Sequence, residues 1–309
     1  MNYIIIVIAL IVFFIENTFA ENFKYNLKYV ELADGIFVIE GDNTRLNSIN
    51  GGAISNTSFI IGSKGILVID AGPSALYAEQ VISIIRSISS IPIKYLVITH
   101  HHPDHSFGIS SYQELGVEII MSSSEILRYE KYGKRLLRQM KNLIGEEWFL
   151  NTKIVDIENN KVFPLKINLG NHQIGIREYK NGHSEGDLVV VDINEEVVFS
   201  GDLIFNKRAP TIPHANIDNW SQYIDILHNN KWKILVPGHG PIIRDKEELY
   251  MTKNWINYIS KIAKEAVEKG LSPAEVFDKG ISDQYKRYHL AQEVWNRDLP
   301  LLMKKYEYQ

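Results

Sequence analysis

A strand-like segment that runs directly into a histidine cluster constrains this chain more than any other feature. Lys94 to Thr99 is rich in β-branched and apolar side chains and predicts a buried strand. The run His100-His101-His102-Pro103-Asp104-His105 follows at once. Histidine and aspartate at this density are typical ligands of zinc and similar divalent ions, although a surface turn without function is the alternative. Because Pro103 disfavours a helix around it, we expect a loop at the strand's C-terminal end, where open α/β sheets place their sites.

Further ligands are expected downstream, because two metal ions need about seven or eight donor atoms, water included. Three candidates each lie at a turn beside a predicted strand, namely His183, Asp202 and His239. Glycines flank each of them and allow backbone segments to approach closely around a crowded centre. Together with the first run, these segments argue against a chance histidine-rich turn.

Apolar periodicity predicts one α/β domain of two similar halves, with strands packed between helices. Residues 21–35 form a polar approach segment, and the first half then contains strands at 35–39, 58–61, 65–69, 94–99 and 117–121 and helices at 74–90, 106–115 and 123–145. The second half contains strands at 166–169, 173–179, 188–193, 197–200 and 233–236 and a helix at 219–227. From Asp245 onward the chain is expected to be mostly helical, with interruptions at 270–273 and near 280.

The N-terminus differs from the rest of the chain. Residues 4–15 are almost purely apolar, a length typical of a signal peptide and short for a membrane span. Small side chains at Thr18 and Ala20 predict cleavage after Ala20, and an uncleaved anchor is the alternative. We therefore expect an exported protein, periplasmic or secreted, without integral membrane association after cleavage.

Composition excludes several classes of function. The chain contains no cysteine, which removes thiolate ligands, a cysteine nucleophile and disulfides. The net charge of −4 and the lack of a basic block argue against nucleic acid as a partner. The expected partner is therefore a small-molecule substrate.

The ordered motifs resemble the metallo-β-lactamase superfamily, whose signature is His-x-His-x-Asp-His followed by three later ligands, over roughly residues 30–245. The resemblance implies an αββα sandwich with the metals at one edge of the two sheets. It divides the chain into a signal peptide (1–20), a metallo-β-lactamase-like domain (21–245) and a helical C-terminal extension (246–309) packed on the same domain. The implied ligands are His100, His102 and His183 for one metal and Asp104, His105 and His239 for the other, with Asp202 bridging the two.

Two positions narrow the branch. Asp202 stands where true metallo-β-lactamases usually carry cysteine or serine, which disfavours β-lactam hydrolysis. His102 stands where flavodiiron oxygen reductases carry glutamate, which favours zinc. Residues 201–211, with Asn50-Gly51-Gly52 and residues 70–74, look most similar to the exported quinoprotein relay system zinc metallohydrolases, which implies a quinoprotein partner.

The resemblance implies a dizinc hydrolase in which a metal-bridging hydroxide cleaves an acyl, ester, lactone or thioester-like bond. Asp104 would be the catalytic residue that orients this nucleophile. The sequence contains no Gly-x-Ser-x-Gly motif that would indicate a serine nucleophile instead. Iron and manganese remain alternatives to zinc. A mononuclear-iron enzyme similar to persulfide dioxygenases is a second hypothesis, and a non-enzymatic metal-dependent accessory for a quinone cofactor or quinoprotein is a third.

Several residues near the motifs have expected supporting roles. Alternation along the run predicts that His101 points away from the metals. By resemblance, Asp70 is a carboxylate that orients the histidine loop. Lys207 and Arg208 are candidates for binding an anionic substrate group, and a solvated turn pair is the alternative. His214 is a candidate to face the pocket.

Overall fold

A computed structural model describes residues 23–158 and 161–308. The apolar run at 4–15 and the expected cleavage point after Ala20 lie outside the described residues. Each helix in the described ranges is too short or too polar to span a lipid bilayer.

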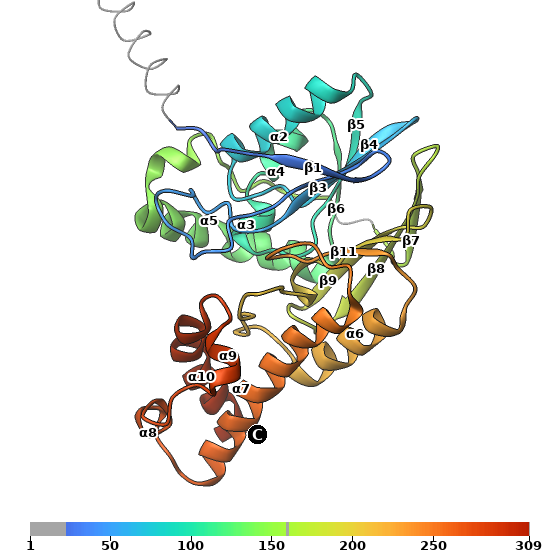
Figure 1. The fold of residues 1–309 in the computed structure, drawn as a ribbon. Coiled ribbons are helices and arrows are strands. Elements are labelled where there is room, and N and C mark those ends of the chain that lie inside the picture. The colour runs from blue at the N-terminus through green and yellow to red at the C-terminus, as the bar shows by residue number, and fades with distance from the viewer. Residues whose placement is uncertain (1–22, 159–160, 309) are drawn as a thin grey trace, which may run out of the picture.

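Two sheets form the centre of the molecule (Figure 1). The first has the order β1 (Tyr29–Ala33), β2 (Ile36–Ile39), β3 (Thr57–Gly62), β4 (Gly65–Ile69), β5 (Ile93–Val97), β6 (Glu118–Ile120). The second has the order β11 (Ile234–Val236), β10 (Val197–Phe199), β9 (Gly186–Asp192), β8 (Gln173–Lys180), β7 (Leu165–Asn168). Most neighbours are antiparallel, but β4, β5 and β6 run parallel, as do β10 and β11. These parallel strands bring their carboxyl ends together at one edge of each sheet.

Three apolar clusters separate the layers. Val38, Val97 and Val190 belong to the cluster between the two sheets. A second cluster packs the first sheet against α2 (Ala75–Ile88), α4 (Ile109–Gln113) and α5 (Ser123–Ile144). The third packs the second sheet against α6 (Ile217–Asn229) and the C-terminal helices. The arrangement is an αββα sandwich, which confirms the expected fold class.

The C-terminal extension consists of helices that lie on the side of the second sheet (Figure 1). They are α7 (Tyr250–Glu268), α8 (Pro273–Phe277), α9 (Asp283–Lys286) and α10 (Ala291–Glu307). Trp255 and Trp295 are at most 1% exposed and belong to the same apolar cluster as Val198 of β10. The extension therefore packs on the sandwich, although the domain boundaries drawn from the sequence stay a prediction.

Two local expectations were wrong. The expected loop holds for residues 100–102, but Pro103 occupies the first turn of the short helix α3 (Pro103–Ser106), with His102 as N-cap. Proline is tolerated there since its missing N–H would have no partner within the helix. Residues 29–33 form the edge strand β1 within the expected polar approach segment, and their exposed side chains leave no apolar alternation to indicate it.

Candidate metal centre

All seven candidate ligands converge, although the sequence separates them by up to 139 positions, from His100 to His239. His100 follows β5, Asp202 lies on the 3-10 helix η2 (Gly201–Leu203) after β10, and His239 follows β11. His183 comes from the turn between β8 and β9. The sandwich thus brings strand ends from both sheets to one edge, as the resemblance implies.

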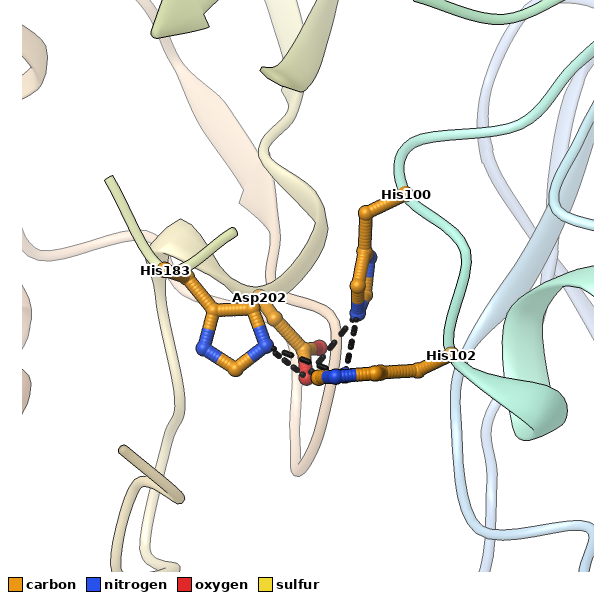
Figure 2. Close-up of side chains that lie close together, drawn as sticks. All are labelled: His100, His102, His183 and Asp202. Atoms are coloured by element: carbon orange, nitrogen blue, oxygen red, sulfur yellow. Dashed lines mark hydrogen bonds and ion pairs between the residues drawn. The ribbon is translucent and has the colours of Figure 1, made fainter. Parts of the chain in front are cut away.

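The first group contains His100, His102, His183 and Asp202, whose side chains point toward one another (Figure 2). His102 Nδ1 lies 2.8 Å from His100 Nε2 and 3.2 Å from His183 Nε2. Two imidazole nitrogens on one tetrahedral zinc ion lie about 3.3 Å apart, given zinc–nitrogen bonds of about 2.0–2.1 Å. The His102–His183 separation agrees with this value and the His100–His102 separation is shorter, so the three nitrogens converge as candidate ligands of one ion.

The second group contains Asp104, His105 and His239. Asp104 Oδ2 lies 3.3 Å from His239 Nε2 and 3.6 Å from His105 Nε2. Both histidines are at most 4% exposed, whereas the Asp104 side chain is 14% exposed and lies nearer the solvent. Asp104 is thus the ligand candidate of this group that an incoming substrate can reach.

Asp202 lies between the two groups. Its Oδ2 is 3.4 Å from His183 Nε2 and 3.3 Å from His239 Nε2, and its Oδ1 is 3.2 Å from His105 Nε2. A Cβ at Gly238 would come within 2.0 Å of Asp202 Oδ1, so only glycine allows this close approach. The carboxylate thus lies between the two groups of ligand candidates, and its bridging of two metals stays a prediction.

Hydrogen bonds from outside the centre fix the ring orientation of three ligand candidates. His105 Nδ1 lies 2.8 Å from Asp70 Oδ2, His239 Nδ1 lies 2.7 Å from the Ile54 carbonyl oxygen, and His100 Nδ1 lies 3.1 Å from Thr99 Oγ1. Each contact leaves Nε2 directed at the centre. Such outer partners are a regular feature of metal-binding histidines.

The electrostatics of the centre suit a cation. Burial would raise the pKa of Asp202, but His239 and His105 hold it well below its usual range, so the carboxylate is ionised. Burial lowers the pKa of His183 to about 4, against the attraction of Asp202, so this imidazole is neutral and able to ligate. Burial opposes a charge on His105, but Asp202 and Asp70 raise its pKa well above the ordinary value. A metal ion binding at His105 therefore displaces a proton.

Unpaired buried atoms provide a test of whether these residues fit a metal. His105 Nε2 and Asp202 Oδ1 are buried 3.2 Å from each other without forming a hydrogen bond, and neither has another hydrogen-bond partner. Buried polar atoms without partners are costly, and a coordinated ion removes that cost. The donor set contains only imidazole nitrogens and carboxylate oxygens, which zinc, iron and manganese all accept. The residues fit a divalent metal.

The three candidate substrate residues have different environments. His214 is exposed, and its Nδ1 lies 3.2 Å from His102 Nε2, so it borders the first group. Arg208 is 6% exposed, with Nη1 donating to the Thr44 carbonyl oxygen. The Lys207 side chain is exposed, and its carbonyl oxygen accepts a hydrogen bond from the His289 N–H. Their binding of a substrate stays a prediction.

Sequence reasoning missed Glu125, a fully buried carboxylate at the start of α5. Its Oε2 accepts a hydrogen bond from the His101 N–H at 2.9 Å and lies 2.5 Å from His101 Nδ1, while its Oε1 accepts from the Gly186 N–H. It therefore connects the histidine run to the strand that follows His183. Ser122 and Glu125 have the spacing of a capping box, which predicts a local role rather than this long-range one. His101 also lies near His102 and His214 in a third group of possible ligands, so its exclusion from the metal centre stays a prediction.

The comparisons agree with this geometry. The model of the metallo-β-lactamase superfamily matches residues 50–239. That is more than half of the chain, and the chain belongs to this superfamily.

Its relatives have diverse activities. A metallo-β-lactamase type 2 from Bacillus sp. (strain 170) is 23% identical over 65% of this chain and 72% of the relative. The acyl-coenzyme A thioesterase MBLAC2 of Gallus gallus is 25% identical over 74% of this chain and 85% of the relative. A solved metallo-β-lactamase from Pontibacter korlensis superposes with a TM-score of 0.59 at 19% identity, over 75% of this chain and 99% of that structure. At this identity the structural likeness shows the fold, and the relatives support a hydrolase.

Proposed function

We propose that this protein is a dizinc hydrolase that cleaves an acyl ester or thioester. The observation that carries the proposal is the placement of Asp202, whose two carboxylate oxygens face His105, His183 and His239 from both ligand groups. The thioesterase relative, which matches this chain along most of its own length, favours the acyl substrate class.

The residues of the centre have different roles in such a reaction. His100, His102 and His183 would hold one ion, and Asp104, His105 and His239 the other, with Asp202 shared. Bound zinc supplies Lewis acidity and lowers the pKa of a coordinated water towards about 7. Asp104, the more exposed carboxylate, accepts a hydrogen bond from the attacking water and orients it. The buried histidines exclude bulk solvent from one side of the site, which strengthens the electrostatic stabilisation of a developing oxyanion.

Export and a quinoprotein partner belong to the proposal as well. The apolar run at 4–15 supports export, and residues 201–211 support the quinoprotein-associated branch. Asp202 in place of cysteine or serine makes a β-lactam the less favoured substrate.

The test is a substrate panel on one purified preparation, containing an acyl thioester, a 4-nitrophenyl ester, a lactone and a chromogenic β-lactam. We expect turnover of the thioester or ester that is lost on chelation and restored by zinc. Oxygen consumption with a persulfide, restored by iron alone, would favour the mononuclear-iron alternative. Inactivity on the whole panel with measurable binding of a quinone cofactor would favour the accessory alternative.

A further inference from the structure

A cavity of about 500 Å³ has walls formed by segments that also contact the metal centre. One wall is the segment between β2 and β3, where Ile54 accepts a hydrogen bond from His239 and Ser55 Oγ donates to the Asp104 carbonyl oxygen at 2.6 Å. Another wall contains Arg208, six positions after Asp202. Burial lowers the pKa of Arg208, and the carboxylates of Asp104 and Asp202 oppose this shift.

The C-terminal extension forms the third wall, through Leu290 and α10. Hydrogen bonds connect it to the wall that carries Arg208. The Ile212 N–H donates to Asp298 Oδ2 at 2.9 Å, and the Ala209 N–H donates to the His289 carbonyl oxygen at 2.9 Å. The extension thus contributes both residues and rigidity to this cavity.

The cavity lining is cationic. It includes the guanidinium groups of Arg45, Arg208 and Arg297 and a single carboxylate, Glu293. Arg45 and Glu293 are 3.8 Å apart with side chains 71% and 54% exposed, a geometry that contributes little. Arg297 pairs with the buried Asp298 and is itself 53% exposed. Positive charge therefore exceeds negative charge along the lining.

Among the three arginines that line the cavity, Arg208 gives the clearest indication of a bound anion. It is 6% exposed, its Nε has no hydrogen-bond partner, and within residues 23–158 and 161–308 it forms no ion pair. A buried guanidinium that no carboxylate contacts directly is costly, and buried guanidinium groups normally pair with a carboxylate or phosphate. Because Arg208 lines the cavity, an anion bound there would supply the carboxylate or phosphate partner that the guanidinium lacks.

We propose that this cavity binds the distal carboxylate of the acyl chain, so that the enzyme prefers monoesters or monothioesters of dicarboxylic acids. The inference rests on the proposed hydrolase function. Guanidinium groups match the planar carboxylate in charge and shape. Leu46, Leu290 and Val294 line the same cavity and offer apolar contact to the methylene chain.

The experiment compares kcat/KM for mono-4-nitrophenyl adipate and 4-nitrophenyl hexanoate, which have equal chain length and differ in the distal carboxylate. We expect the wild-type protein to prefer the adipate at least about 10-fold, since charge-assisted hydrogen bonds are the strong ones. Arg208→Gln and the more exposed Arg297→Gln should each reduce this ratio several-fold. Arg287→Gln removes the same charge from the same extension outside the cavity lining, and it should leave the ratio unchanged.

Calorimetric titration with free adipate gives a second measurement that does not depend on turnover. Adipate binding that weakens in Arg297→Gln but not in Arg287→Gln supports the cavity. Hydrolysis of both esters with equal efficiency, or equal adipate binding by both variants, overturns the carboxylate site while leaving the hydrolase proposal standing. Hydrolysis of neither ester counts against the hydrolase proposal, and the titration then decides on the cavity alone.

Discussion

At the scale of single residues, the centre depends on partners that hold each imidazole in one orientation. The residue types and their spacing made the ligand candidates predictable, because few other patterns place histidine and aspartate at the ends of several strands. The ring nitrogen that each histidine presents was not predictable. His102 turns Nδ1 to the first group whereas His100 and His183 turn Nε2, and that choice follows from contacts made only in the folded chain.

Asp70 provides a test of this orientation. It accepts hydrogen bonds from the Thr99 N–H and Oγ1 and lies against His105 Nδ1, and its φ of 62° is in the left-handed region. Asp70→Asn keeps the shape and tolerates this conformation but removes the charge. We expect zinc affinity to fall about 10- to 100-fold, as measured by competition with a chromophoric chelator.

The matched control is Asp192→Asn, because Asp192 lies 2.7 Å from the buried His172 in a pair that contains no candidate ligand. It should leave zinc affinity unchanged. Equal losses in both variants would mean that the Asp70 effect is one of general stability rather than of His105 orientation.

At the scale of helices and strands, the sequence was most informative where a segment is buried. β10 is a buried apolar run, β5 ends in two buried apolar residues, and polar ligands follow both, so both strands were predictable. β1 was not, because an edge strand with exposed side chains carries no alternating pattern. The cavity beside Arg208 could not be predicted from the sequence either, because it forms only where α10 packs against a loop more than 80 positions earlier in the chain.

The connection between α10 and that loop has a measurable consequence. Asp298 is fully buried and accepts the Ile212 N–H, so Asp298→Ala leaves a buried donor without its partner. We expect a loss of about 1–3 kcal/mol in the free energy of unfolding by denaturant. Asp283→Ala, at an exposed position on the same extension, is the control and should leave the free energy of unfolding nearly unchanged. Equal stability of the two variants would contradict a structural role for the Asp298 contact.

At the scale of the whole molecule, the two halves of the sandwich contribute different ligands. His100, His102, Asp104 and His105 come from the first sheet's side, and His183, Asp202 and His239 from the second. Bound metal would therefore join the halves as well as supply the chemistry, in a chain that has no cysteine for a disulfide. The superfamily and the sandwich were predictable from the motifs, whereas the substrate was not, since it depends on the cavities around the centre rather than on the ligands.

The most direct measurement of the central claim is the metal content of the purified wild-type protein and of Asp202→Asn, by mass spectrometry after dialysis. The account predicts about two zinc ions per wild-type chain and fewer in Asp202→Asn, because one carboxylate serves both ligand groups. The control Asp283→Asn should retain the wild-type content. A wild-type protein that binds no metal under zinc-replete conditions, or an Asp202→Asn variant that retains both ions, would contradict the account.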